Sequence, residues 1–307
     1  MSASILADRK RHVDQLGYDY AAQPKGDLPR CNLCNDECLV HITHRDRYGY
    51  PARASACSRC GLTFLNPVMT REAYGNFYAR IYRPLVSAYH NRLIDAQTIQ
   101  AEQKEYAKRL ADFLKPWLGT AKFKTMLDIG GSTGVVALEL ARQFDLKTAV
   151  LDPAAAELDW ASRAGVEAIA GFLEDYDPGA RQFDVVILCQ TIDHLTDATG
   201  SLKKIRQLTR PGGVFFVDIV DFRAAYLRNW SVEEAVKIDH PYYFTEETVA
   251  ALLRRAGFRV LRKDYSPDHL HVGYVCTPGE PEAAALPDAA QVRKFFREIR
   301  FIQNAPR

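Results

Sequence analysis

Four cysteines in two pairs are the residues whose spacing points most directly to a chemistry. Five of the seven cysteines lie between positions 31 and 60, and four of them form the pairs Cys31/Cys34 and Cys57/Cys60, with 22 residues between the pairs. A pair spaced by two residues can place both sulfurs on one metal ion, and a second pair then completes a tetrahedral site. The spacing predicts one zinc ion. Four thiolates leave no open position on it, so its role is structural.

Disulfide bonds are the alternative use of these cysteines. The first 17 residues carry charges where a secretion signal needs an apolar stretch, so we expect a cytoplasmic protein in a reducing compartment. That expectation favours zinc over disulfides. Cys38, His41 and His44 lie between the pairs and could replace a ligand, but four thiolates already saturate a structural site.

A second candidate site follows two short apolar segments. Residues 125–134, TMLDIGGSTG, are an expected strand and a glycine-rich turn, and the next expected strand ends at Asp152. Gly130 and Gly134 have no side chain, so the backbone can approach a ligand closely, and Asp152 can accept hydrogen bonds from both hydroxyls of a ribose. Strands that alternate with helices predict a parallel sheet with helices on both faces and a ligand crevice at the carboxyl ends of the strands.

These motifs resemble those of a known family. Residues 127–134, LDIGGSTG, resemble the first motif of class I S-adenosylmethionine-dependent methyltransferases, with Ser132 where the middle glycine usually stands. Further matches follow in the family's order, at residues 183–188, 190–195, 208–213, 240–245 and 256–258. The resemblance covers roughly residues 125–277. It implies an α/β fold with a Rossmann-like, seven-stranded methyltransferase sheet.

The resemblance implies S-adenosylmethionine as the cofactor. Asp128 would lie near the amino end of its methionine moiety, and Asp152 would hold the ribose with Pro153 beside the adenine. The implied cofactor-binding residues are Asp128, Gly130, Gly131, Gly134, Asp152, Pro153, Phe172, Leu173 and Gln190. Phe172 stands where the family often has an acid. The adenine amine would therefore meet Glu174, Asp175 or the backbone alone.

The order of segments resembles a narrower subgroup. A four-cysteine module, a helix rich in tyrosine and phenylalanine and a methyltransferase core follow one another in the sugar C-methyltransferases and related enzymes of glycan and antibiotic pathways. This resemblance implies a small polar acceptor, namely a sugar, a nucleotide sugar or a glycan. An RNA methyltransferase that grips RNA with its zinc module is the alternative. The chain shows no dense basic patch interleaved with aromatic residues, which disfavours RNA.

Two histidines are candidates for the general base, because an imidazole can accept a proton at neutral pH. His194 follows the fourth expected strand, and His240 precedes the aromatic run at residues 242–244. The sugar subgroup often has Tyr-His-Glu-His before its late aromatic residues, with the last histidine beside the substrate. Residues 237–240 are Lys-Ile-Asp-His here, so His240 is the stronger candidate by resemblance. A structural role is the alternative for each.

The sequence divides into four expected segments. They are a zinc-binding module at 1–68, a helical substrate or lid segment at 69–124, the methyltransferase core at 125–277, and a linker with an amphipathic helix at 278–307. Residues 1–125 carry a net charge of +7 and residues 126–307 a net charge of −5, so an anionic substrate could be steered to the N-terminal part. The amphipathic helix would dock on the chain's own core or on a second copy.

Composition excludes other classes of protein. Hydrophobic residues make up 47% and charged residues 25% of the chain, which are ordinary values for a globular protein. No apolar run approaches the roughly 20 residues needed to span a bilayer, so we expect no membrane contact. A non-catalytic scaffold with a degenerate cofactor-binding fold is a further alternative. The intact Asp128, glycine turn and Asp152 argue against it. Homo-oligomers remain compatible with the sequence.

Overall fold

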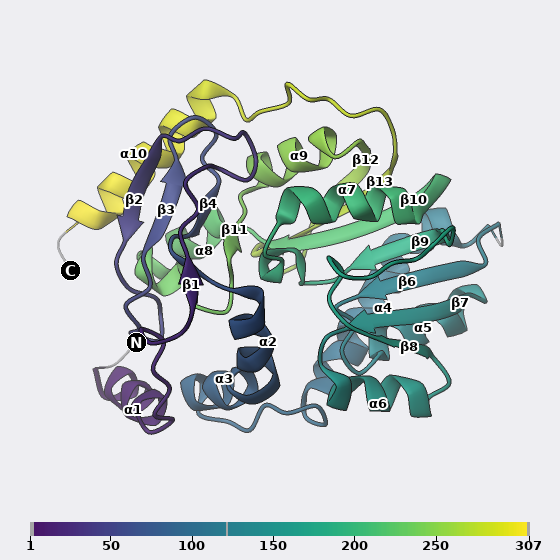
Figure 1. The fold of residues 1–307 in the computed structure, drawn as a ribbon, viewed down its shortest axis with the longest axis horizontal. Helices are drawn as coiled ribbons and strands as arrows, with labels where there is room; N and C mark the ends of the chain where they lie inside the picture. The colour runs from purple at the N-terminus through teal and green to yellow at the C-terminus, as the bar shows by residue number, and fades with distance from the viewer. Residues whose placement is uncertain (1–2, 121, 306–307) are drawn as a thin grey trace.

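The centre of the molecule is a seven-stranded sheet with the strand order β12-β13-β10-β9-β6-β7-β8 (Figure 1). We describe it from a computed structural model that covers residues 3–120 and 122–305. The strands are β6 (Thr125–Ile129), β7 (Lys147–Asp152), β8 (Glu167–Ala170), β9 (Phe183–Leu188), β10 (Thr209–Val220), β12 (Phe258–Tyr265) and β13 (His271–Pro278). The five strands from β8 to β10 are parallel, whereas β13 is antiparallel to both of its neighbours. The predicted α/β fold is confirmed.

Helices cover both faces of this sheet because its strands are apolar on both sides. On β6, Leu127 faces the cluster that includes helices α7 (Ala198–Leu208) and α9 (Glu246–Arg255). Its neighbour Met126 faces the opposite cluster, which the other helices complete. Those helices are α4 (Ile99–Leu118), α5 (Val135–Phe144) and α6 (Ala155–Arg163). The glycine turn therefore lies at an edge with a helical layer on each side.

A smaller sheet lies beside the central one. It has the order β11-β4-β3-β2, from strands β2 (Leu39–Thr43), β3 (Ala54–Cys57), β4 (Thr63–Leu65) and β11 (Tyr242–Tyr243). Strands β1 (Lys25–Gly26) and β5 (Val68–Met69) form a separate antiparallel pair. Because β11 follows His240 in the chain, the N-terminal module and the segment expected to carry the base share one sheet.

The segment between the two sheets is helical, as its sequence predicts. Helices α2 (Arg71–Arg80) and α3 (Tyr82–His90) meet at Ile81, and α4 follows after a loop. Thr70 caps α2, since its hydroxyl accepts a hydrogen bond from the Ala73 amide at 3.2 Å. The aromatic face of α2 is buried, so these rings pack into a core.

The chain ends pack on the N-terminal half. Helix α1 (Ala3–Asp14) contacts α3. Helix α10 (Ala289–Asn304) buries its whole predicted apolar stripe against the N-terminal module and α8 (Phe222–Asn229). It therefore docks on the chain's own core. Among the described residues, no helix is long and apolar enough to cross a membrane.

Candidate functional site

The glycine turn joins β6 to α5 and is held in a left-handed conformation. Gly130 has φ 72°, and a Cβ there would lie 2.5 Å from the side chain of Thr191, so only glycine fits. Ser132 also has a positive φ, of 51°. This conformation explains why a glycine usually stands at that place and why a serine there adds strain.

Asp128 presents an unpartnered carboxylate behind this turn. Its side chain is buried, and neither carboxylate oxygen has a hydrogen-bond partner among the described residues. Burial, together with the nearby carboxylate of Asp152, raises the pKa of Asp128 to about 8. Buried acceptors are normally paired, so these oxygens fit the ammonium group that the resemblance places here.

Asp152 is fixed by two backbone amides. Its carboxylate accepts hydrogen bonds from Ser132 N at 2.9 Å and Ala154 N at 2.7 Å, one on each oxygen. Burial raises its pKa to about 6, against the lowering effect of these bonds. Each oxygen keeps one acceptor position, which suits the two hydroxyls of a ribose.

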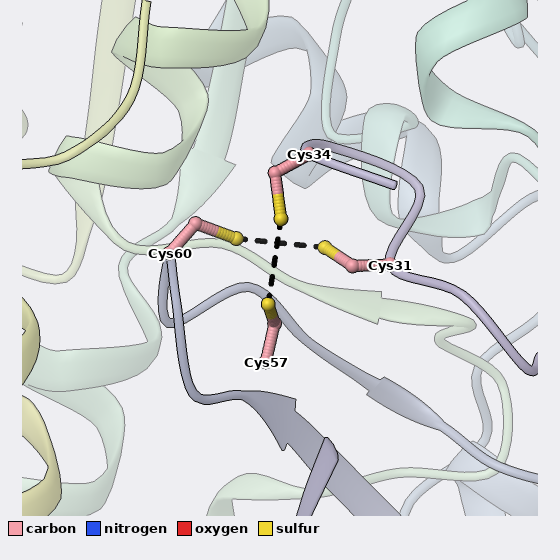
Figure 2. A group of neighbouring side chains, drawn as sticks. All are labelled: Cys31, Cys34, Cys57 and Cys60. Carbon is pink, nitrogen blue, oxygen red and sulfur yellow. Dashed lines mark hydrogen bonds between the residues drawn. The ribbon is translucent and has the colours of Figure 1, made fainter. Parts of the chain in front are cut away.

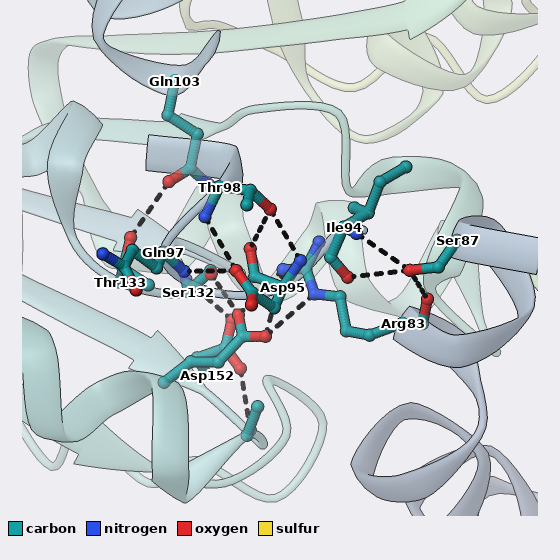
Figure 3. Close-up of polar contacts among 12 residues, drawn as sticks. Arg83, Ser87, Ile94, Asp95, Gln97, Thr98, Gln103, Ser132, Thr133 and Asp152 are labelled. Atoms are coloured by element: carbon teal, nitrogen blue, oxygen red, sulfur yellow. Dashed lines mark hydrogen bonds and ion pairs between the residues drawn. The ribbon is translucent and has the colours of Figure 1, made fainter. Parts of the chain in front are cut away.

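Helices α3 and α4 reach over the turn (Figure 3). Arg83 of α3 forms a bidentate ion pair with Glu157 of α6, with N–O distances of 3.0 to 3.1 Å, and Glu157 also accepts a hydrogen bond from the Ser132 hydroxyl. The Thr133 hydroxyl donates to Gln103 of α4 at 2.9 Å. The helical segment is therefore tied to the turn and to the helix behind it.

The loop after β8 adjoins Asp152. Gly171 N donates to Asp152 O at 3.1 Å, which brings Phe172 and Leu173 to this edge. Phe172 lies beside Gly75 of α2, where an added Cβ would meet its ring at 3.4 Å, and Leu173 is buried in the core. Their contact with adenine stays a prediction, as does that of the exposed Pro153.

Both acids that could replace the missing adenine contact have other partners. Glu174 accepts a hydrogen bond from the Thr196 hydroxyl at 3.2 Å, and Asp175 pairs with Arg71 at 2.6 Å. Of the three options for the adenine amine, this arrangement favours the backbone.

Gln190 follows β9 and lines a cavity of about 420 Å³. The backbone N–H of Gln190 donates to one carboxylate oxygen of Asp218 at 2.6 Å. The hydroxyl of Tyr106 on α4 donates to the other oxygen at 2.9 Å. Asp218 is not among the residues predicted from the sequence. An acid inside the apolar run 214–219 could have indicated it, because a buried acid needs a partner.

His194 and His240 lie together at the carboxyl edge of the sheet, with ring centroids 4.7 Å apart. His240 is enclosed by two carboxylates, since its Nδ1 lies 2.9 Å from Asp193 and its Nε2 lies 3.2 Å from Asp239. Burial lowers the pKa of His240, but the carboxylates outweigh burial and raise it above its ordinary value. Because both ring nitrogens face carboxylates, both are placed to donate, and the doubly protonated form of His240 is favoured.

His194 is held differently. Tyr78 of α2 lies 2.6 Å from His194 Nδ1 and donates its proton to the Asp239 carbonyl, also at 2.6 Å. The phenol has one proton, so its oxygen accepts from Nδ1–H, and the lone pair of His194 is on Nε2. Burial lowers the pKa of His194 to about 4, which keeps the ring neutral.

Asp193 joins the two histidines. Its Oδ2 pairs with His240, while its Oδ1 lies 4.0 Å from His194 Nε2 and has no hydrogen-bond partner among the described residues. The carboxylate and both imidazoles each place one potential ligand atom within 4.8 Å of the others. The Lys237 ammonium lies 3.4 Å from His240 Nε2 and would repel a cation there. This charge disfavours a metal ion at the cluster.

The four predicted cysteines converge (Figure 2). The Sγ atoms of Cys31 and Cys60 are 3.5 Å apart, as are those of Cys34 and Cys57, and all four atoms lie within 4.8 Å of one another. Cys38 is exposed and is not part of this group.

The cysteine module also holds both histidine segments. Asn32, between two of the cysteines, donates to Asp197 and accepts from Thr199 N, both at 2.8 Å, at the start of α7. Asp46, in the loop between β2 and β3, accepts from Ile238 N at 3.0 Å. These bonds fix the loops that carry His194 and His240.

Comparison with known proteins identifies the family of the chain. The profile of a family described as "Methyltransferase domain" matches residues 99–263, more than half of the chain. A ubiquinone biosynthesis O-methyltransferase from Methylobacterium sp. (strain 4-46) is 30% identical over 105 residues, which are 32% of this chain. The match spans only 41% of that relative.

A solved structure shares the fold at low sequence identity, and a second is a weaker match. The PH0226 protein from Pyrococcus horikoshii OT3 superposes with a TM-score of 0.50 at 18% identity, over 58% of this chain and 91% of that one. A S-adenosylmethionine-dependent methyltransferase from Clostridium acetobutylicum ATCC 824 gives a TM-score of 0.49 at 15% identity, over 67% of this chain and 99% of that one. With the family match and the turn described above, the chain belongs to the class I S-adenosylmethionine-dependent methyltransferases.

Proposed function

We propose that the chain transfers a methyl group from S-adenosylmethionine to a hydroxyl group of a small polar acceptor, which is a sugar, a nucleotide sugar or a glycan. One observation carries the chemistry: a neutral His194 with its Nε2 lone pair beside the unpartnered Oδ1 of Asp193. The Methylobacterium relative is an O-methyltransferase, which supports oxygen as the acceptor atom. The order of cysteine module, aromatic helix and methyltransferase core supports the sugar class.

His194 is the proposed general base. When the acceptor oxygen attacks the methyl carbon, the bond from that carbon to sulfur breaks and the hydroxyl proton moves to His194 Nε2. The new imidazolium is stabilised by Asp193, whose Oδ1 lies 4.0 Å from Nε2. The cofactor supplies the methyl group, and the residues of this chain orient the acceptor and take the proton.

His240 is the proposed positioning residue. Both of its nitrogens face carboxylates, so it has no free lone pair with which to accept a proton. It holds the Asp193 side chain with Oδ1 free. We therefore rank His194 ahead of His240, the reverse of the order that the subgroup resemblance suggests.

We also propose that Cys31, Cys34, Cys57 and Cys60 hold one zinc ion. Sulfurs about 2.3 Å from a tetrahedral zinc lie roughly 3.8 Å from each other, close to the two observed distances of 3.5 Å. A disulfide would need a separation of about 2.05 Å. The ion would stabilise the module and take no part in methyl transfer.

Transfer of label tests the acceptor class. Purified protein would be incubated with methyl-tritiated S-adenosylmethionine and with panels of nucleotide sugars, glycans and RNA, beside a His194→Ala control. We expect label in the sugar or glycan panel, strongly reduced in the control. Label confined to RNA would overturn the acceptor class. Equal labelling by the control would overturn the role of His194.

A further inference from the structure

A second cavity lies beside the histidine cluster. It has a volume of about 220 Å³, and its lining includes His240 and Asp193. Three cationic side chains line it from separate segments, namely Arg47 of the cysteine module, Arg228 of α8 and Lys237 of the loop before β11. It is smaller than the roughly 300 Å³ at which pockets for whole ligands begin, so it suits one end of a molecule.

The charges of these three side chains are not neutralised. Within the described chain, none of them forms a salt bridge with a carboxylate. Arg47 donates to the Glu234 carbonyl at 3.0 and 2.6 Å, and Arg228 donates to the Asp268 carbonyl. Carbonyl oxygens carry no net charge, so both guanidinium groups stay positive overall.

The Lys237 ammonium is the most constrained of the three. It is partly buried, and the described polar atom that it contacts is His240 Nε2 at 3.4 Å, a nitrogen that already faces Asp239 as a donor. Its backbone is held by Tyr243, whose hydroxyl accepts from Lys237 N at 3.0 Å and donates to Lys237 O at 2.5 Å. Burial lowers the pKa of Lys237, against the raising effect of Asp239 and Asp193. A charged group removed from water is costly unless it is paired.

The other cation of α8 is paired. Arg223, five residues before Arg228, forms two bonds with Glu298 at 2.8 and 2.6 Å. What distinguishes the cavity is that three such side chains from separate segments line one hollow. The acid that lines it, Asp193, already pairs with His240.

We propose that this cavity binds a phosphate or carboxylate group of the acceptor, so that the substrate is an anionic small molecule. The inference rests on the proposed function, and it specifies in addition that the acceptor is negatively charged. The anion would lie against Lys237, next to His240, while the hydroxyl to be methylated reaches His194 on the other side of the same cluster. A sugar phosphate or a sugar acid has both groups within one small molecule.

Titration with simple anions tests the proposal. Inorganic phosphate and acetate would each be titrated by calorimetry into protein saturated with S-adenosylhomocysteine. We expect saturable binding of at least one anion, and the stronger of the two identifies the group. Lys237→Met and Arg228→Ala should each weaken that binding about 10- to 150-fold, the loss of one charge-assisted hydrogen bond. Lys203→Met, on the exposed face of α7, is the matched control.

The outcomes separate this inference from the proposed function. No saturable binding of either anion, or equal affinity in wild type and in both variants, overturns the inference while S-adenosylhomocysteine binding and methyl transfer stand. If the wild type does not bind S-adenosylhomocysteine at all, the result would instead contradict the methyltransferase function. Arg228 is exposed, so its variant keeps the test valid even if Lys237→Met fails to fold.

Discussion

Two clusters of metal-binding residue types differ in how completely their atoms are used. The four cysteines supply four identical sulfur atoms within 4.8 Å of one another, and they line neither of the two cavities at the sheet edge. The Asp193, His194 and His240 cluster is uneven, since one histidine is enclosed by carboxylates while the other keeps a free nitrogen beside a free oxygen. A symmetric, saturated set suits a structural ion. An uneven, unsaturated set suits a reaction.

The first prediction removes the symmetric cluster and has the largest expected effect. Cys57→Ser/Cys60→Ser should lose the single zinc equivalent and unfold the module, because binding of a structural zinc is a large part of such a module's folding free energy. Metal analysis and circular dichroism would measure both losses. Cys38→Ser, an exposed cysteine outside the cluster, should retain zinc. Full zinc content in the double variant would show that the assigned ligands are wrong.

The second prediction acts on the uneven cluster. His194→Ala should lower turnover by about 10²- to 10⁴-fold, the usual contribution of a general base, with cofactor affinity nearly unchanged. His240→Ala should lower turnover by a smaller factor. His12→Ala on α1 is the control. A larger loss for His240 than for His194 would restore the ranking that the resemblance suggests.

The third prediction concerns the cofactor. Asp152→Ala should weaken S-adenosylhomocysteine binding by about 1.5 to 3 kcal/mol, measured by calorimetry, because hydrogen bonds to a charged group are lost. The pKa of Asp152 is about 6, and protonation removes acceptor capacity, so wild-type affinity should fall as pH drops below about 6. Asp112→Ala, exposed on α4, should match the wild type. Unchanged affinity in Asp152→Ala would remove the ribose assignment.

The fourth prediction tests whether the two clusters are connected. Asn32→Ala removes two hydrogen bonds to the start of α7, so it should destabilise the protein by about 1 to 3 kcal/mol and lower turnover a few-fold while zinc is retained. Thermal melts and initial rates would show this. Asn304→Ala at the end of α10 is the control. Wild-type turnover in Asn32→Ala would mean that the module does not position His194.

The sequence predicted the elements that depend on local pattern. The two cysteine pairs converge as predicted. The strand, the glycine turn and Asp152 meet at the carboxyl ends of β6 and β7, also as predicted. Short-range spacing and apolar runs determine both arrangements. Contacts between distant segments could not be read in this way. Tyr78 meets His194 across 116 positions, and no periodicity in either segment encodes that pairing.

The shared sheet is a second example of such a limit. Strand β11 has two residues and pairs with β4, so its sequence carries too little pattern to predict a partner. Its two tyrosines belong to the aromatic run after His240, and nothing in that run indicates a partner strand. The role of His240 depends on the same packing, because Asp193 comes to it from another segment.

Nitrogen NMR of the histidine rings tests the central claim most directly, since it needs no acceptor. We predict that His240 stays doubly protonated to a higher pH than an ordinary histidine, because its carboxylate neighbours raise its pKa and face both of its nitrogens. His194 should be neutral with its proton on Nδ1, because its pKa is lowered to about 4 and Tyr78 accepts from that nitrogen. His194→Gln and His240→Gln would assign the signals. A His240 that titrates no higher than an ordinary histidine, or a His194 protonated on Nε2, would contradict the assignment of His194 Nε2 as the proton acceptor.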